Sequence, residues 1–156
     1  MNQAVTACVI VIGNEILSGR TQDTNLNHIA TTLGGWGIQV HHARVIPDDE
    51  DIIVNTINEV RTTYDYIFTT GGIGPTHDDI TAVCIAKAFA VPVIQHPEIA
   101  ERIRQRPAPD DIMASRLLMA RVPEGASLID NPSGGPQGFA MDNVYVMAGI
   151  PRVMQA

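Results

Sequence analysis

Aromatic residues, cysteines and long apolar runs are all scarce in this sequence. Of its 156 residues only 4% are Phe, Trp or Tyr, so a hydrophobic core must be built mainly from Ile, Val, Leu, Ala and Met. The two cysteines, Cys8 and Cys84, are too few for a disulfide framework or a zinc knuckle. We interpret both as buried thiols of a cytosolic protein.

The longest apolar run covers residues 7–12. It is far shorter than the roughly 20 residues that an apolar helix needs to cross a bilayer. Residues 1–3 lack the positive charge that opens a signal peptide. We therefore expect a cytoplasmic protein that does not interact with membranes.

Positive charge is scarce as well. Lys and Arg number 10 against 17 Asp and Glu, which gives a net charge of −7, and the basic residues form no cluster. A protein that coats nucleic acid needs a positive stripe for the phosphates, so we expect no nucleic-acid partner. Apolar residues make up 45% of the chain, which argues against disorder. Because a chain of this length can bury about 68–70% of its unfolded surface, we expect residues 1–156 to form one domain.

Strand-like and helix-like segments alternate along the chain. Runs of β-branched residues predict strands, and apolar residues spaced three or four apart predict helices. The predicted strands cover residues 4–12, 38–46 and 64–70, with shorter ones at 91–94, 127–130, 139–141 and 144–147. The predicted helices cover residues 26–33, 47–60, 78–89, 97–104 and 109–120, and a last helix opens at 149–151 and is cut short at Ala156. Such alternation predicts an α/β protein with a mostly parallel sheet covered on both faces.

Parallel sheets bind ligands beyond the carboxyl ends of their strands. Three of the predicted strand ends carry glycine or polar turns, at residues 13–15, 71–74 and 148–151. If these strands are neighbours, one crevice collects all three turns.

Residues 69–81 combine a strand end, a glycine turn and a helix start. They read Thr-Thr-Gly-Gly-Ile-Gly-Pro-Thr-His-Asp-Asp-Ile-Thr. Glycine permits positive φ and close approach of a ligand to the backbone, and free N–H groups at a helix start attract anions. Thr70 and Thr76 add hydroxyl donors, and Pro75 stiffens the turn. The glycine spacing matches neither a P-loop nor a dinucleotide-binding fingerprint.

An anionic ligand would meet a repulsive field from the net charge, so attraction must come from backbone amides, a bound cation or a few arginines. Asp78 and Asp79, beside His77, could hold Mg²⁺ or another divalent cation. An aspartate before a helix is also an ordinary N-cap, worth about 1 kcal/mol. Spacing alone favours the cap for one aspartate and leaves the other open, with His77 as a solvent-facing turn residue. Asp48, which opens the acidic helix start, is also most simply a cap.

A second polar cluster follows the first predicted strand and covers residues 13–20 and 23–25. It could be a polar loop in which Asp23 or Thr24 caps the next helix. It could equally be a recognition site at the switch point, where Glu15 and Asp23 bind a cation. The sequence leaves both explanations open.

Together these motifs resemble the MoaB/Mog molybdopterin-binding domain family. The resemblance is strongest to the branch found at the N-terminus of CinA-type competence/damage-inducible proteins and of some FAD synthases. It covers almost the whole chain, and the 69–81 segment is its most specific part. The residues that carry it are 13–19, 23–25, 69–81, 131–132 and 148–151.

The resemblance implies a three-layer α/β/α sandwich with a mostly parallel central sheet, and a pocket for molybdopterin or its adenylylated form. It implies a link to molybdenum-cofactor biosynthesis and, for an enzyme, metal-dependent adenylylation with Asp48 and Asp79 as catalytic residues and Asp78 and Asp79 as metal ligands. Relatives form dimers, trimers or hexamers, so we expect a homo-oligomer. The substrate-binding residues expected from the motifs and the resemblance are Gly13, Asn14, Glu15, Ser18, Asp23, Thr70, Gly71, Gly72, Gly74, Pro75, Thr76, Asp78, Gly149 and Pro151.

Two other functions fit the same resemblance. In CinA-like relatives the domain is associated with pyrophosphate hydrolysis of ADP-ribose- or FAD-type dinucleotides, which shares metal-assisted phosphoanhydride chemistry with adenylylation. A non-catalytic regulatory or assembly domain is the third hypothesis, and the retained aspartates argue against it. Family members usually read Ala-Pro-Gly-Phe after the Asn-Pro pair, whereas residues 136–139 read Pro-Gln-Gly-Phe. Because that loop lies near the pocket in the family, the identity of the phosphorylated pterin or nucleotide stays open.

Overall fold

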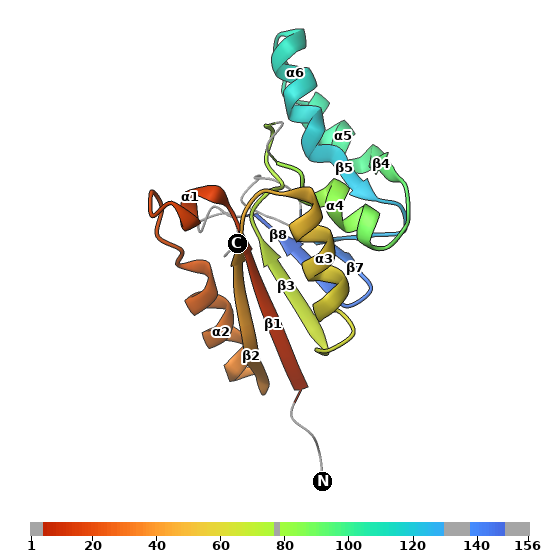
Figure 1. Cartoon of the computed structure of the whole chain (residues 1–156). Coiled ribbons are helices and arrows are strands. Elements are labelled where there is room, and N and C mark those ends of the chain that lie inside the picture. Colours follow the sequence, from red (N-terminus) through yellow and green to blue (C-terminus); the bar gives the residue numbers. More distant parts are fainter. Residues whose placement is uncertain (1–4, 77–78, 130–137, 149–156) are drawn as a thin grey trace.

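The structure, a computed structural model, describes residues 5–76, 79–129 and 138–148 (Figure 1). Its helices are α1 (Asn14–Leu17), α2 (Asn25–Gly35), α3 (Glu50–Val60), α4 (Thr81–Ala88), α5 (Pro97–Arg104) and α6 (Asp110–Leu117), and a 3₁₀ turn, η1 (Leu118–Ala120), follows α6. Its strands are β1 (Val5–Ile12), β2 (Ile38–Ile46), β3 (Tyr66–Thr70), β4 (Val93–Gln95), β5 (Arg121–Pro123), β6 (Ser127–Ile129), β7 (Gly138–Met141) and β8 (Val144–Met147).

Six strands form one sheet in the order β2-β1-β3-β8-β7-β6. The strands β2, β1, β3 and β8 run parallel, and β7 and β6 add antiparallel strands at one edge. The predicted mostly parallel sheet is therefore confirmed, in the form of a mixed sheet. The predicted short strand at 91–94 is present as β4, whereas β5 was not predicted, and the two pair antiparallel in a separate ribbon.

Helices cover both faces of the sheet, which makes the three layers that the resemblance implied (Figure 1). Strand β1 is packed on both sides: Cys8 and Ile10 belong to the core cluster that includes α3 and α4, whereas Ala7 and Val9 pack with α2. Successive side chains of a strand point to opposite faces. A strand covered on both sides is therefore apolar throughout, as residues 7–12 are, and all of these residues are buried.

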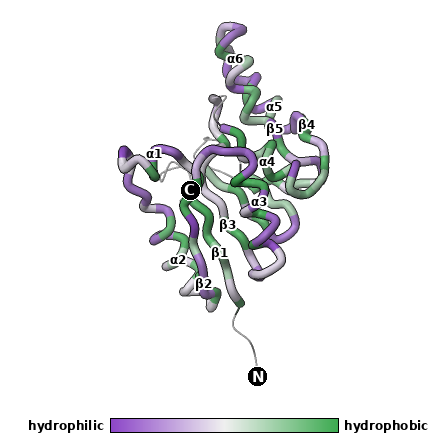
Figure 2. The backbone as a smooth tube through the Cα atoms, in the orientation of Figure 1, coloured by the Kyte–Doolittle hydropathy of each residue, from purple (hydrophilic) through white to green (hydrophobic). Residues whose placement is uncertain are grey.

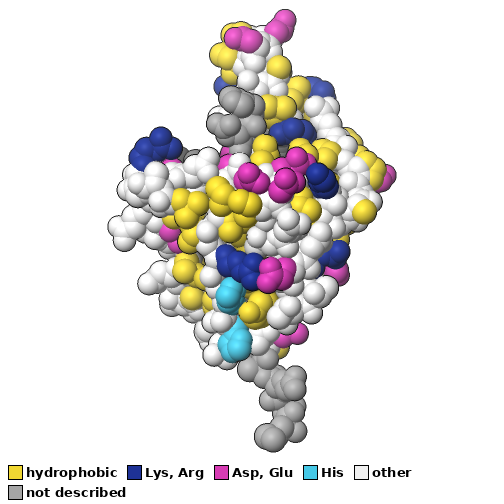
Figure 3. Space-filling model, viewed as in Figure 1, with side chains coloured by type: hydrophobic (Ala, Val, Ile, Leu, Met, Phe, Trp, Pro, Cys, Tyr) yellow, Lys and Arg dark blue, Asp and Glu magenta, His cyan; other side chains and the backbone are white. Residues whose placement is uncertain are grey.

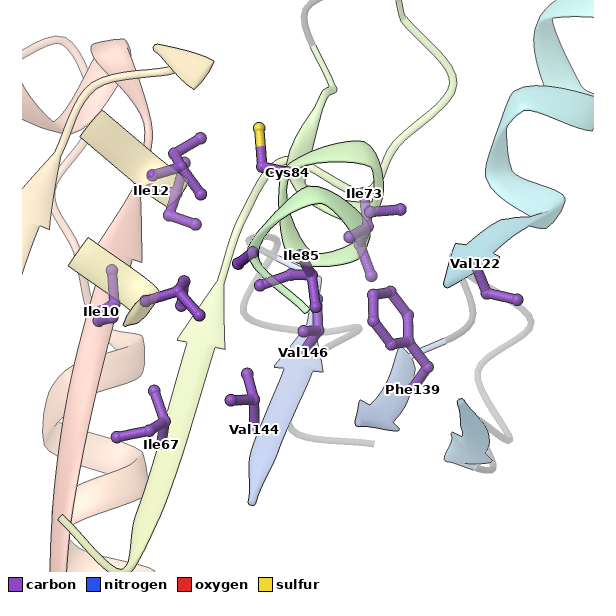
Figure 4. Packing of buried hydrophobic residues seen from close by; sticks show 14 of the residues in the cluster. Ile10, Ile12, Ile67, Ile73, Cys84, Ile85, Val122, Phe139, Val144 and Val146 are labelled. Atoms are coloured by element: carbon purple, nitrogen blue, oxygen red, sulfur yellow. The ribbon is translucent and has the colours of Figure 1, made fainter. Parts of the chain in front are cut away.

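The larger core cluster lies between the sheet and the pair of helices α3 and α4 (Figure 4). Ile53 and Ile57 of α3 and Ile85 of α4 are all 0% exposed. Phe139 of β7 is the largest fully buried side chain and belongs to the same cluster. The aliphatic core expected from the low aromatic content is thus present, and truncating one of these side chains to alanine would cost roughly 2–5 kcal/mol.

The predicted helix at 78–89 begins later than expected. Helix α4 starts at Thr81 because Asp79 belongs to the preceding turn, where its N–H donates to the Thr76 carbonyl at 3.1 Å. The predicted helix at 109–120 is α6 followed by the 3₁₀ turn η1. The first of these differences matters for the site, because it removes Asp79 from the helix.

A helical arm, residues 97–120, stands above the body of the protein next to the β4–β5 ribbon (Figure 1). Ile99 and Ala100 of α5 are buried, but α6 buries no residue. Polar and apolar residues are mixed along α6 (Figure 2), and Ile112 is 44% exposed. Helix α6 is therefore the part of the arm that is least tied to the core.

Basic side chains are dispersed over the face shown in Figure 3. Within the described ranges, surface ion pairs join Arg44 to Glu59 at 2.9 Å, Lys87 to Glu50 at 3.2 Å, and Arg102 to Glu98 at 2.8 Å. Such exposed pairs contribute only about 0–1 kcal/mol each.

In the part of the chain that the structure describes, no helix has the length and apolar character needed to cross a membrane.

Both cysteines are free and buried, as predicted. Cys8 of β1 and Cys84 of α4 belong to the same core cluster, where Figure 4 labels Cys84. Burial raises the pKa of the Cys8 thiol to about 11, against a small opposing effect of Arg44. Burial, reinforced by the nearby Glu50 carboxylate, raises the pKa of the Cys84 thiol to about 12. Both thiols are therefore protonated and unreactive near neutral pH.

Alkaline pH should destabilise the fold through these thiols. In the unfolded chain a thiol ionises near its ordinary pKa of about 8.5, whereas in the fold Cys8 and Cys84 stay protonated to about 11 and about 12. Their contribution to stability is complete below the unfolded pKa and is lost as the pH rises toward the folded values. Urea unfolding at about pH 8 and about pH 10.5 should show a larger loss of unfolding free energy in the wild type than in a Cys8→Ala/Cys84→Ala variant. Equal losses in the two proteins would contradict this expectation.

Candidate functional site

The carboxyl ends of four parallel strands meet at one edge of the sheet. At this edge the Gly13 N–H donates to the Ile46 carbonyl at 3.0 Å, which joins the end of β1 to the end of β2. The Gly71 N–H donates to the Met147 carbonyl at 3.0 Å, which joins β3 to β8. The predicted convergence of the turns after β1 and β3 is therefore confirmed, while residues 149–151 lie outside the described residues.

Asp48 joins the ends of β1 and β2 through a reciprocal pair of hydrogen bonds. The Asn14 N–H donates to Asp48 Oδ2 at 3.1 Å, and the Asp48 N–H donates to Asn14 Oδ1 at 3.1 Å. The predicted role of Asp48 as a helix cap is wrong, because Asp49 is the N-cap of α3 and its Oδ1 accepts from the Ile52 N–H at 3.1 Å. Asp48 therefore holds a site loop together instead of capping a helix.

The first two glycines of the 69–81 segment are required by close backbone packing. Gly71 has φ +99°, and a Cβ there would collide with the Ile12 carbonyl oxygen at the end of β1. Gly72 has φ +77°, and a Cβ there would collide with Thr81 Oγ1. The Thr81 hydroxyl donates to the Gly71 carbonyl at 2.9 Å, and the Thr81 N–H donates to the Gly72 carbonyl at 3.0 Å. The turn is thus fixed between the end of β1 and the start of α4.

Asp79 closes the second half of this motif. Its Oδ2 accepts hydrogen bonds from the Thr76 N–H at 2.9 Å and from the Thr76 hydroxyl at 2.8 Å. A Cβ on Gly74 would lie 2.8 Å from the same oxygen, so the carboxylate rests against that glycine. The N-cap of α4 is Ile80, which makes no side-chain capping bond, so Asp79 is not the aspartate that caps this helix. Residues 77–78, including the predicted metal ligand Asp78, lie outside the described residues.

Two threonine hydroxyls are buried where β3 enters the glycine turn. Thr69 is 0% and Thr70 is 1% exposed. Within the described residues, neither Oγ1 atom has a hydrogen-bond partner. A buried hydroxyl that lacks a partner costs about 1–3 kcal/mol, so these two groups are a polar feature that the packing of the fold alone does not explain.

The loop after β1 is held mainly by its own residues. The Glu15 carboxylate folds over Gly13, where an added Cβ would lie 2.8 Å from Glu15 Cδ. The exposed Ser18 hydroxyl donates to the Glu15 carbonyl at 3.3 Å. Asp23 accepts from the Asn25 N–H at 3.3 Å and from the Leu26 N–H at 3.1 Å. Thr24 is the N-cap of α2, and Asp23 accepts from the first N–H groups of the helix from the position before it.

No group of three or more His, Cys, Asp or Glu side chains that could hold a metal ion occurs among the residues that the structure describes. Asp48 and Asp79 follow β2 and β3, which lie on either side of β1 in the sheet. A protein cage for a cation is thus absent from residues 5–76, 79–129 and 138–148. Mg²⁺ is commonly held by one or two carboxylates, with waters and ligand oxygens in the rest of its shell.

Sequence reasoning missed Arg121, the first residue of β5. Its Nη2 donates to the Asp79 carbonyl at 3.3 Å and its Nε donates to the Leu118 carbonyl at 3.2 Å. The side chain is partly buried. No local signal could have revealed this contact, because the two residues are 42 positions apart.

The structure defines an α/β protein with a glycine turn at the carboxyl ends of its parallel strands. A family model described as "Probable molybdopterin binding domain" matches residues 8–156. The chain therefore belongs to the molybdopterin-binding domain family, as the motifs had indicated.

Curated relatives point to one branch of this family. A protein of Archaeoglobus fulgidus is 35% identical over 147 residues, which are 94% of this chain and 63% of that protein. A CinA-like protein of Desulfosudis oleivorans is 34% identical over 94% of this chain and 37% of its own length. The chain spans less than two thirds of the length of these relatives.

Solved structures give the same result. CinA from Thermoplasma acidophilum, a protein of unknown function, superposes with a TM-score of 0.88 at 33% identity, over 97% of this chain and 92% of its own. MoaB from Thermus thermophilus, a molybdopterin biosynthesis enzyme, superposes with a TM-score of 0.59 at 18% identity, over 97% of this chain and 85% of its own. The second match shows the fold alone, whereas the first confirms the CinA-type resemblance.

Substituting Gly71 should destabilise the protein more than substituting a glycine of similar φ in open space. Gly125 has φ +90° and no atom within 4 Å of an added Cβ, so Gly125→Ala carries only the backbone strain of about 1–2 kcal/mol. Gly71→Ala adds the collision with the Ile12 carbonyl, for roughly 1–3 kcal/mol more. Urea unfolding measures the difference, and equal losses in the two variants would show that the turn can move away from β1.

Proposed function

We propose that this chain binds a phosphorylated pterin or a nucleotide at the carboxyl edge of its sheet, as a molybdopterin-binding domain. The observation that carries the proposal is the glycine motif from Gly71 to Asp79. This chain belongs to the molybdopterin-binding family, and its motif joins the end of β3 to the start of α4. The Thr81 hydroxyl donates to the Gly71 carbonyl, and the Asp79 carboxylate accepts from Thr76. The Gly71–Gly72 part of the motif, held by Thr81, keeps its backbone groups in place before a ligand arrives.

Phosphate is the part of such a ligand that this edge suits best. Backbone N–H groups in a glycine turn and near a helix start favour anions. Thr70 adds a buried hydroxyl that has no hydrogen-bond partner among the described residues. A phosphate oxygen in reach of that hydroxyl would recover a hydrogen bond that the protein leaves unmade.

A divalent cation would offset the repulsion between a phosphate and a chain of net charge −7. Mg²⁺ is commonly held by one or two carboxylates together with substrate phosphates, and Asp48 and Asp79 are carboxylates at this edge. When bound, the cation would neutralise phosphate charge and polarise a phosphoryl oxygen. Asp78 remains a candidate ligand from the sequence alone.

The ligand-binding residues that we propose fall into three groups. The phosphate-binding part is Thr70, Gly71, Gly72, Gly74, Pro75 and Thr76. The second group, in the loop after β1, contains Gly13, Asn14 and Glu15. Ser18 and Asp23 belong to the same loop and would contribute by holding its conformation. The third group rests on the sequence alone and contains Asp78, Gly149 and Pro151. That the protein forms a homo-oligomer also remains a prediction.

Hydrolysis of a dinucleotide pyrophosphate is a second candidate function. It is favoured by the high structural similarity to a CinA protein, at a TM-score of 0.88, compared with 0.59 for MoaB. Both candidates use the same phosphate-binding edge, so they differ only in whether a phosphoanhydride bond is cleaved. A non-catalytic domain would bind without any turnover.

Neutralising Asp79 should weaken ligand binding without removing its hydrogen bond. In Asp79→Asn the amide oxygen can still accept from Thr76, while the charge that would face a cation is lost. Isothermal titration with molybdopterin and with ADP-ribose, each with Mg²⁺, should show at least a roughly tenfold weaker Kd for the ligand that binds, equal to about 1.4 kcal/mol. Asp110→Asn, an exposed carboxylate on the arm, is the matched control and should keep the wild-type Kd. An unchanged Kd in Asp79→Asn would remove Asp79 from the site.

Turnover separates the two candidates. The protein is mixed with ADP-ribose, FAD or ATP in the presence of Mg²⁺, Mn²⁺ or Co²⁺, and release of AMP or phosphate is followed. AMP release that is lost in Asp48→Asn would support the pyrophosphatase. Absence of turnover with every substrate, alongside measurable binding, would leave the binding function and discard the hydrolase.

A further inference from the structure

The helical arm contacts the glycine motif through the side chain of Arg121. This residue stands where the arm ends and β5 begins, and it pairs with Gln95 in the β4–β5 ribbon. Its guanidinium donates to two backbone carbonyls, of Leu118 in the arm at 3.2 Å and of Asp79 in the site at 3.3 Å. One planar group therefore joins the base of the arm to the edge where the ligand is proposed to bind.

The carbonyl that Arg121 contacts is not used by the neighbouring helix. The hydrogen bonds of α4 start one residue later, where the Cys84 N–H donates to the Ile80 carbonyl at 3.0 Å. Among the described residues, the Asp79 carbonyl accepts its hydrogen bond from Arg121, while the Asp79 carboxylate bonds to Thr76. Asp79 is held at both ends, by its side chain within the motif and by its backbone from the arm.

We propose that Arg121 is a positioning residue for the candidate site: it fixes the Asp79 peptide, and with it the Thr76–Asp79 turn, against the base of the arm. The effect on ligand binding rests on the proposed function, whereas the effect on the turn does not.

An arginine suits this role better than a lysine. Its guanidinium presents several N–H donors in a rigid plane, so it can reach two carbonyls in different directions at once. A lysine ammonium is a compact point donor on a flexible stem. Arg121→Lys keeps the positive charge but loses the planar arrangement of N–H donors. The variant therefore separates the positioning effect from a purely electrostatic one.

The amide of Thr76 reports the state of the turn directly, because its N–H donates to Asp79 Oδ2. Hydrogen exchange measured by NMR on the full chain should show roughly threefold to tenfold faster exchange at Thr76 in Arg121→Met, as expected for a local opening. Arg121→Lys should give an intermediate rate. The amide of Ile67, which donates to the Asn143 carbonyl at 2.9 Å in the core, should exchange at the wild-type rate in both variants.

Arg116→Met is the matched control, because Arg116 donates to the Arg106 carbonyl at 3.4 Å, within the arm. It should leave Thr76 exchange unchanged. Wild-type exchange at Thr76 in Arg121→Met overturns the proposal. An equal acceleration at Thr76 and Ile67 also overturns it, because Arg121 would then act on global stability. If Arg121→Met does not fold, Arg121→Lys decides, and wild-type exchange at Thr76 in that variant overturns the proposal.

Titration with ADP-ribose and Mg²⁺, and with molybdopterin and Mg²⁺, completes the test. Faster Thr76 exchange in Arg121→Met together with a weaker Kd supports both the positioning role and the proposed function. Faster exchange in a protein whose wild type binds neither ligand supports the positioning role and removes the proposed function. Wild-type binding with unchanged Thr76 exchange in Arg121→Met removes the positioning role and leaves the proposed function intact.

Discussion

The backbone of Gly71 lies directly against the last carbonyl of β1, and the architecture of the site depends on this contact. Parallel pairing of β1 with β3 brings the two strand ends to the same edge, but a Cβ at position 71 would push them apart. With glycine there, the chain can turn from β3 and bond through Thr81 into the start of α4. The close approach thus sets where α4 begins and keeps Asp79 in the turn before it.

Carboxylates at this edge hold loops in place as well as carrying charge. Asp48 links β1 to β2 through Asn14, and Asp79 closes a turn through Thr76. Each carboxylate is therefore fixed by hydrogen bonds to backbone groups before any cation or phosphate arrives. Side chains that are already immobilised lose less conformational entropy when a ligand binds.

The arm adds a contact that the αβ core does not supply. Its helix α6 buries no residue, so its position is set at its base and not by packing along its length. Arg121 joins that base to the glycine motif, since one guanidinium bonds to both the Leu118 carbonyl of the arm and the Asp79 peptide. A helix that buries no residue is in this way connected, through the base of the arm, to the Asp79 peptide.

Periodic hydrophobic patterns were enough to predict the α/β class, the parallel sheet and the burial of Cys8 and Cys84, because burial of apolar side chains is the main force that such patterns record. The 69–81 segment was enough to indicate the family. The roles of individual carboxylates were harder to predict. Asp48 and Asp79 were both expected as possible caps, and each instead bonds to a loop partner.

The sequence by itself determined the α/β class, the mostly parallel sheet covered on both faces and the glycine turn after β3, since all of these follow from local pattern and from the steric limits on the backbone. Only the tertiary structure decided which aspartate caps α3, what Asp79 bonds to and that Arg121 reaches the site. The reason is physical: a hydrogen bond between side chain and backbone depends on positions to within a few tenths of an ångström. Residues 42 positions apart reach such positions only when the whole chain has packed.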